Sequence, residues 1–182
     1  MNEVNIKTRL LYRFCPSSYS ATVFDIDYDE LRDQGRTNLL FDLDNTLVAR
    51  DSNRVSSELK ELFERLLGEG FKIAIVSNNW GERVSDFGKK AGVPVSGRAF
   101  KPLKRAFRLA MDLIGSKKDT TVAIGDQLFT DIYGANQFGI MTILVSPVSN
   151  TDLLHTKMLR YVERAILGRL TKLGYLQNWQ EG

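Results

Sequence analysis

The amino-acid sequence predicts an α/β protein of three layers, built around a central and mostly parallel sheet. Three observations lead to this prediction. Short apolar runs alternate along the chain with stretches of helical periodicity. Several runs end directly in acidic or other polar residues, as strands do when their carboxyl ends form a ligand-binding edge. The 182 residues are 43% hydrophobic, which suffices for one sizeable core.

We therefore expect a single domain over residues 1–182, with its core at about 36–148. An N-terminal segment (1–35) and a C-terminal amphipathic helix (151–171) are the expected appendages. No internal repeat or low-complexity run divides the chain.

The first acidic pair of the chain has a structural explanation. Residues 22–27 form an apolar approach to Asp-x-Asp. Asp27 and Glu30 have the spacing of a capping box, which predicts a short helix through Leu31 to Gln34. Asp also caps helices and forms turns elsewhere, so an Asp-x-Asp pair alone carries little functional weight.

The second acidic pair is followed by a threonine. Residues 39–47 form an apolar run that ends on Asp42, Asp44 and Thr46. We expect this run to be a central strand whose acids lie at the carboxyl edge of the sheet. Two carboxylates placed together there need a cation or a proton.

A second strand is predicted at Phe71–Val76, after a helix at about 56–67. It ends in Ser77, Asn78 and Asn79, whose hydroxyl and amides could receive phosphate oxygens. A helix at about 82–91 and a short strand then lead to the next polar group.

That group is Lys101, which precedes Pro102, a favourable first residue for a helix to about Ile114. Lys104 competes for the same role from one turn further on. We prefer Lys101 because it lies at the exit of the strand, whereas Lys104 is expected on a solvated face.

The last polar strand end follows an apolar run at Thr120–Ile124. Gly125 and Asp126 end the run, and Asp131 comes five residues after Asp126. A helix at about 131–138 and a final core strand at Met141–Val145 complete the predicted sheet.

The four strand ends resemble the motifs of the haloacid dehalogenase superfamily of phosphohydrolases. Taken with Lys-Pro and Thr-Ile-Leu-Val-x-Pro-Val, they are similar to the YqeG family of class IIIA phosphatases, which is related to mitochondrial and plastid phosphatidylglycerophosphate phosphatases. The resemblance runs from about Tyr12 to about Tyr175 and implies a Rossmann-like fold without a cap domain. The matching positions are Asp42, Asp44, Thr46, Ser77, Lys101, Asp126 and Asp131.

Phosphoryl transfer needs a nucleophile, neutralised phosphate oxygens and a proton for the leaving group. Asp42 is the expected nucleophile and would form an aspartyl-phosphate. Asp44, two residues on, is the expected general acid and then general base, and it would hold its proton in the Michaelis complex. The family resemblance implies the same order of roles.

Mg²⁺ is the expected cofactor, because acids facing a phosphate dianion require a hard cation. Asp42, Asp126 and the main-chain carbonyl of Asp44 are the expected ligands, with Asp131 acting directly or through another ligand. One His and one Cys are too few for a zinc site.

Four residues are expected to contact the phosphate. Lys101 would supply a point charge to the phosphate and to the nucleophile, and hydroxyl or amide groups would donate hydrogen bonds. The expected phosphate-binding residues are Thr46, Ser77, Asn78 and Lys101.

The C-terminal segment predicts a basic amphipathic helix, and two interpretations stay open. Its apolar face either packs on the domain or, together with the basic and apolar stretch at 7–14, contacts an anionic membrane surface. The apolar positions are Leu154, Met158, Tyr161, Val162, Ala165 and Ile166, and the basic ones are Lys157, Arg160 and Arg164.

An uncapped site favours a phosphate carried on something large or surface-bound. The absence of a long apolar stretch and of a signal-peptide core predicts a cytoplasmic protein, with peripheral membrane attachment as an open expectation. The net charge of +3 favours any polyanion, but no nucleic-acid module is recognisable. The oligomeric state is left open.

We rank first a Mg²⁺-dependent phosphatase for phosphatidylglycerophosphate or a similar lipid phosphate. A phosphatase for a nucleic-acid end, a protein or a soluble metabolite comes second. The alternative from another class is a binding protein that docks on RNA, a ribosome or a membrane.

Overall fold

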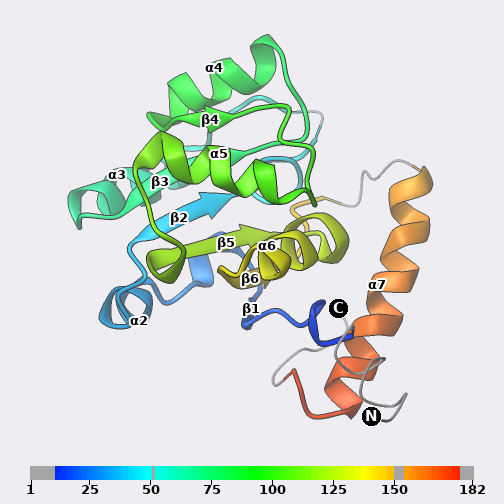
Figure 1. Cartoon of the computed structure of the whole chain (residues 1–182). Helices are drawn as coiled ribbons and strands as arrows, with labels where there is room; N and C mark the ends of the chain where they lie inside the picture. The colour runs from blue at the N-terminus through cyan, green and yellow to red at the C-terminus, as the bar shows by residue number, and fades with distance from the viewer. Residues whose placement is uncertain (1–10, 51, 150–153, 177–182) are drawn as a thin grey trace.

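The structure, a computed structural model, describes residues 11–50, 52–149 and 154–176. Within them a six-stranded sheet has the order β1-β6-β5-β2-β3-β4, and every neighbouring pair is parallel. The predicted α/β class with a parallel sheet is confirmed (Figure 1). The strands are β1 (Ser18–Ser20), β2 (Asn38–Phe41), β3 (Lys72–Val76), β4 (Val95–Ser96), β5 (Thr121–Gly125) and β6 (Met141–Val145).

Helices pack on both faces of this sheet, and the alternation of side chains along the strands explains why. In β2, Leu39 and Phe41 face one hydrophobic cluster with α2, α3 and α4, whereas Leu40 faces the cluster with α5 and α6. The helices are α2 (Tyr28–Asp33), α3 (Ser57–Gly68), α4 (Glu82–Ala91), α5 (Lys104–Ile114), α6 (Tyr133–Phe138) and α7 (Leu154–Lys172).

Most predicted elements lie within a few residues of their expected positions. Asp27 caps α2 by accepting a hydrogen bond from the N–H of Glu30, as the capping box predicts. The helix expected from Pro102 begins instead at Lys104. The edge strand β1 was not predicted, because its Ser-Tyr-Ser sequence carries no apolar run.

A π-helix, η3 (Leu128–Ile132), lies between β5 and α6, where the sequence predicted a helix beginning at Asp131. Its wider turn places Asp131 inside the connection rather than at a helix start.

Helix α7 stands apart from the two helical layers and packs against η3 and β6 (Figure 1). Of the predicted apolar positions whose side chains are described, Ile166 packs on the domain beside the buried Leu167 and Leu170, whereas Ala165 is exposed and Tyr161 and Val162 are 72% and 50% exposed. A buried carboxylate sets the rotation of the helix. Glu163 Oε1 accepts hydrogen bonds from the N–H groups of Leu128 (2.8 Å) and Phe129 (3.4 Å) at the start of η3. The predicted positions Leu154 and Met158 and the basic Lys157 and Arg160 have side chains outside the described part.

Two segments could admit an inserted cap in this fold. In the described chain the first, 47–56, is a loop, and the second, 79–101, holds only α4 and β4. The carboxyl edge of the sheet is therefore open above β2, in agreement with the predicted uncapped arrangement.

Candidate active site

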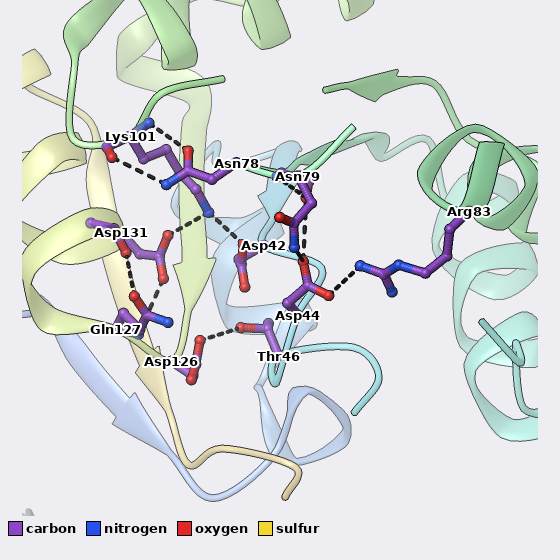
Figure 2. A network of polar contacts seen from close by, with 12 residues as sticks. Asp42, Asp44, Thr46, Asn78, Asn79, Arg83, Lys101, Asp126, Gln127 and Asp131 are labelled. Atoms are coloured by element: carbon purple, nitrogen blue, oxygen red, sulfur yellow. Dashed lines mark hydrogen bonds and ion pairs between the residues drawn. The ribbon is translucent and has the colours of Figure 1, made fainter. Parts of the chain in front are cut away.

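The predicted polar residues meet at the carboxyl edge of β2, β3 and β5 (Figure 2). Asp42 follows β2 directly, Asp126 follows β5, and Ser77 follows β3. Lys101 enters from the loop before α5, and its side chain is buried. Lys104 is exposed on α5, as expected for the competing lysine.

Three buried carboxylates form the centre of the site. Oxygen atoms of Asp42, Asp126 and Asp131 lie within 4.8 Å of one another. Lys101 Nζ donates to Asp131 Oδ1 over 2.6 Å and also to Asp42 Oδ1. When all four groups are ionised, one ammonium faces three carboxylates, and the cluster carries an excess of negative charge.

The pKa values of this cluster report the same imbalance. Burial raises the pKa of Asp42 to about 8 against the opposing effect of Lys101, and Asp131 and Asp126 raise it further. Burial disfavours the charged form of Lys101, but Asp131 and Asp42 outweigh it and hold the pKa of Lys101 above its ordinary value. An all-oxygen donor set with excess negative charge fits a hard divalent cation.

Asp131 can enter this cluster because residue 125 is a glycine. A Cβ on Gly125 would lie 2.4 Å from Asp131 Cγ, far inside contact distance. The other oxygen of Asp131, Oδ2, accepts a hydrogen bond from the N–H of Gln127 (3.1 Å), which orients the carboxylate. Gly125 thus allows the close approach of a side chain from η3 to the end of β5.

Asp44 lies beside this cluster and is held by three donors. Arg83 Nη2 donates to Oδ1 (2.5 Å), while Asn79 Nδ2 (2.8 Å) and Ser77 Oγ (3.4 Å) donate to Oδ2 (Figure 2). Arg83, in the first turn of α4, was not predicted as a site residue. Its position four residues after Asn79, at the start of the next helix, was the available signal, but sequence spacing does not reveal which carboxylate it reaches.

Two predicted phosphate contacts have protein partners. The side-chain amide of Asn78 bonds the backbone of Lys101, and Thr46 Oγ1 donates to Asp126 Oδ1 over 3.2 Å. These contacts position Lys101 and Asp126. Phosphate contact by Asn78 and Thr46 stays a prediction, as does metal binding by the main-chain carbonyl of Asp44.

A cavity of about 260 Å³ opens over Asp42, Asp44 and Lys101. A larger cavity, of about 690 Å³, lies against α4 and contains none of the predicted site residues. The acidic and basic residues that line the smaller cavity therefore identify it as the candidate catalytic cavity. Sequence reasoning missed four residues that line it: Arg50, Gln127, Thr130 and Leu159.

Comparison with known proteins shows the family of the chain. Residues 11–139 match the haloacid dehalogenase-like hydrolases. The chain is 40% identical over 168 residues to "Probable phosphatase YqeG" of Bacillus subtilis (strain 168), covering 92% of this chain and 97% of the relative. It is 29% identical over 160 residues to phosphatidylglycerophosphate phosphatase 1, chloroplastic/mitochondrial, of Arabidopsis thaliana, covering 82% of this chain and 46% of that protein.

A solved structure supports the fold. The 3-deoxy-D-manno-octulosonate 8-phosphate phosphatase of Yersinia pestis superimposes with a TM-score of 0.50 at 14% identity, covering 80% of this chain and 89% of that one. At this identity the likeness concerns the fold alone.

Proposed function

The chain belongs to the haloacid dehalogenase-like hydrolases and is a phosphatase, and from this premise we propose that it hydrolyses a lipid phosphomonoester, in the presence of Mg²⁺, through an aspartyl-phosphate. The observation that carries the proposed mechanism is the buried group of Asp42, Asp126 and Asp131 around Lys101. It combines a carboxylate nucleophile with a fixed cation and oxygen donors at one open edge.

In the first step, an oxygen of Asp42 attacks phosphorus and forms the aspartyl-phosphate while the bond from phosphorus to the ester oxygen breaks. Asp44 gives its proton to the departing alkoxide. Lys101 lies against Asp42 and balances charge on the phosphoryl oxygens.

In the second step, water attacks the phosphorus of the aspartyl-phosphate, Asp44 removes a proton from that water, and the bond to Asp42 breaks. Inorganic phosphate leaves, and both carboxyl groups return to their starting states. Ser77 is placed beside Asp44, where its hydroxyl can donate to the transferring group.

Asp42 and Asp126 would hold Mg²⁺, with Asp131 beside them. When bound, the ion supplies positive charge that allows a phosphate dianion to approach these carboxylates. The main-chain carbonyl of Asp44 is the proposed third protein ligand.

An apolar rim supports a lipid substrate. We define this rim as Trp80, Phe100, Leu103 and Leu159, which are 66%, 66%, 61% and 42% exposed. Leu159 lines the catalytic cavity, Phe100 and Leu103 flank Lys101 in the chain, and Trp80 follows Asn79. Trp80 also lines the larger cavity against α4. Exposed apolar side chains on segments that neighbour the site residues in the chain suit a substrate that is presented with acyl chains.

The backbone near this rim has unfavourable φ values at two residues. Arg98 and Phe100 have φ values of 51° and 55°, which bulky side chains rarely adopt. The guanidinium of Arg98 lies 3.7 Å from the ring centre of Trp80. A tryptophan paired with a cation is suited to the boundary between lipid and water, which supports peripheral attachment to an anionic membrane.

Two further findings bear on this proposal. The Arabidopsis relative is named a phosphatidylglycerophosphate phosphatase. Among the described residues, no helix combines the length and the apolar character needed to cross a bilayer.

The decisive experiment measures phosphate release from phosphatidylglycerophosphate in mixed micelles, with Mg²⁺ or with EDTA, beside p-nitrophenyl phosphate as a generic ester. We expect Mg²⁺-dependent release that Asp42→Asn abolishes, that Lys101→Ala strongly reduces and that the exposed control Lys104→Ala retains. Turnover of the generic ester alone would refute the lipid substrate but would remain consistent with Asp42 as the nucleophile.

A further inference from the structure

Arg50 lines the catalytic cavity beside Asp42 and Asp44, and the proposed reaction gives it no role. Its Nε atom is buried and has no hydrogen-bond partner in the described part of the chain. A buried guanidinium N–H without an acceptor is costly, so native proteins seldom leave one unless a ligand completes it. Arg50 thus has an unused hydrogen-bond donor in a residue that lines the cavity.

The other cations of the site are already paired. Lys101 bonds Asp42 and Asp131 deep in the cavity. Arg83 donates to Asp44 and, through Nη1, to the main-chain oxygen of Ser52 over 3.0 Å, on the loop that follows Arg50. Since Arg83 neutralises Asp44, the charge of Arg50 is available on this side of the cavity.

The two sides of the cavity thus differ in charge. Negative charge is in excess around Asp42, Asp126 and Asp131, where the phosphoryl group and its cation belong. Asp44, the residue that protonates the leaving oxygen, pairs with Arg83, and Arg83 also bonds Ser52 on the loop that follows Arg50. A substrate must direct its alcohol portion toward Asp44, so the side of the cavity that Arg83 and the loop of Arg50 approach is the leaving-group side.

We propose that Arg50, supported by Arg83, binds a second anionic group of the substrate, a phosphate ester a few atoms from the scissile bond. This inference rests on the proposed phosphatase function and narrows its substrates to phosphomonoesters whose alcohol carries another phosphate or phosphodiester. A planar guanidinium donates paired hydrogen bonds to phosphate oxygens, which makes it selective for such a group.

The same subsite is linked to the acid. Both carboxylate oxygens of Asp44 accept hydrogen bonds, Oδ1 from Arg83 and Oδ2 from Asn79 and Ser77. A protonated Asp44 uses one oxygen as a donor, which weakens the contact that this oxygen accepts. A second anion competes with Asp44 for Arg83 and so makes this change easier.

The test compares two soluble esters, propane-1,3-diol bisphosphate and 3-hydroxypropyl phosphate, which differ only in the second phosphate. We expect wild type to favour the bisphosphate in kcat/KM and Arg50→Ala to reduce that preference about tenfold or more, as the loss of a charge-assisted contact predicts. The control Arg54→Ala removes an equal charge from an exposed position on the same loop and should keep the preference. Thermal unfolding establishes that both variants are folded.

A lipid source of the second anion is tested with phosphatidylglycerophosphate and phosphatidic acid in the same micelles. Both have acyl chains and a phosphomonoester, but phosphatidic acid lacks the phosphodiester. A preference for phosphatidylglycerophosphate that Arg50→Ala removes identifies the lipid diester, whereas a preference confined to the soluble pair identifies a soluble bisphosphate.

Two results would overturn the proposal: no preference of the wild type in either pair, or an equal loss on all four substrates in Arg50→Ala, which would assign Arg50 to the transferring phosphoryl. If the wild type hydrolyses none of them, the proposed function fails separately. Calorimetric titration of the two soluble esters into Asp42→Asn with Mg²⁺ then tests the subsite, and the titration is repeated with Arg50→Ala added. Weaker binding of the bisphosphate to the double variant supports the Arg50 subsite, and unchanged binding refutes it.

Discussion

Asn78 and Lys101 are joined by two hydrogen bonds, one from the N–H of Lys101 to Asn78 Oδ1 (2.6 Å) and one from Asn78 Nδ2 to the carbonyl oxygen of Lys101 (3.2 Å). The amide thereby fixes the backbone from which the lysine reaches the buried carboxylates. A loop after β3 and a loop before α5 are locked together at the residue that carries the fixed positive charge.

Replacing Asn78 by Ala should lower kcat/KM for p-nitrophenyl phosphate by about tenfold to a hundredfold, because Lys101 loses its orientation. A double-mutant cycle with Lys101→Ala measures how Asn78 acts. If it acts through Lys101, adding Asn78→Ala to Lys101→Ala costs no further activity. If Asn78→Ala lowers kcat/KM as much in the Lys101→Ala background as in the wild type, Asn78 instead contacts phosphate directly.

The leaving group should determine the effect of Asp44→Asn. An amide cannot supply the proton, so alkyl phosphates should lose about a hundredfold or more in kcat, while p-nitrophenyl phosphate, whose phenolate leaves readily, should lose much less in the first step. Rates for a series of aryl and alkyl phosphates provide the measurement. Equal losses across the series would contradict the role of Asp44 as general acid.

The stability of the metal-free protein should fall as pH rises. The pKa of Asp42 is about 8 in the folded protein against an ordinary value of 3.8, so between these values the folded protein retains a proton that the unfolded chain releases. The free energy of unfolding then decreases with increasing pH across this window. Asp42→Asn should weaken this dependence and stabilise the metal-free protein at pH 9.

Urea unfolding in EDTA at pH 5, 7 and 9, repeated with Mg²⁺, tests this expectation. Mg²⁺ should stabilise the wild type most at high pH, where the carboxylates are ionised, and should stabilise Asp42→Asn less. A wild-type stability that rises from pH 5 to 9 in EDTA, with the same change in Asp42→Asn, would contradict it.

Removing the carboxylate of Glu163 should weaken the docking of α7 on the domain. Glu163→Ala leaves the N–H groups of Leu128 and Phe129 without this acceptor, at a cost of about 1–3 kcal/mol in the free energy of unfolding. Glu163→Gln retains an acceptor oxygen and should lose less. Urea unfolding measures both variants, and equal stability of Glu163→Ala and wild type would show that the contact is dispensable.

The apolar rim should matter only at a lipid surface. Phe100→Ser with Leu103→Ser should reduce turnover of micellar phosphatidylglycerophosphate several-fold and leave p-nitrophenyl phosphate turnover within about twofold. Leu113→Ser is a matched control, because Leu113 is 53% exposed at the opposite end of α5. Equal effects of the rim and control variants on the lipid would refute membrane contact by this rim.

Local patterns predicted the sheet well because buried parallel strands are continuous apolar runs. The predicted strand Met141–Val145 has those bounds in the structure, and the polar residues after β2, β3 and β5 do converge. The first acidic pair, which ends at Asp27, was separated from the site because Glu30, three residues on, indicates its capping role.

Long-range contacts explain what the sequence did not reveal. Arg50 lines the cavity from a loop and Arg83 reaches Asp44 from the first turn of α4, and no periodicity encodes either contact. On the packed face of α7 the carboxylate of Glu163 bonds η3 beside Leu167 and Leu170, none of which belongs to the apolar pattern that included Tyr161 and Val162. Apolar periodicity does not reveal a long-range hydrogen bond from a charged side chain.

Hydrogen bonding between β2 and β5 has a practical consequence for anyone producing this protein. Phe41 pairs with Ile124, and Asp42 and Asp126 follow from that pairing. A slip of one residue would turn one of these acids to the other face of the sheet. Catalytic turnover is therefore an assay of correct strand registration, and the specific activity of a refolded batch reports what fraction of its molecules acquired the native topology.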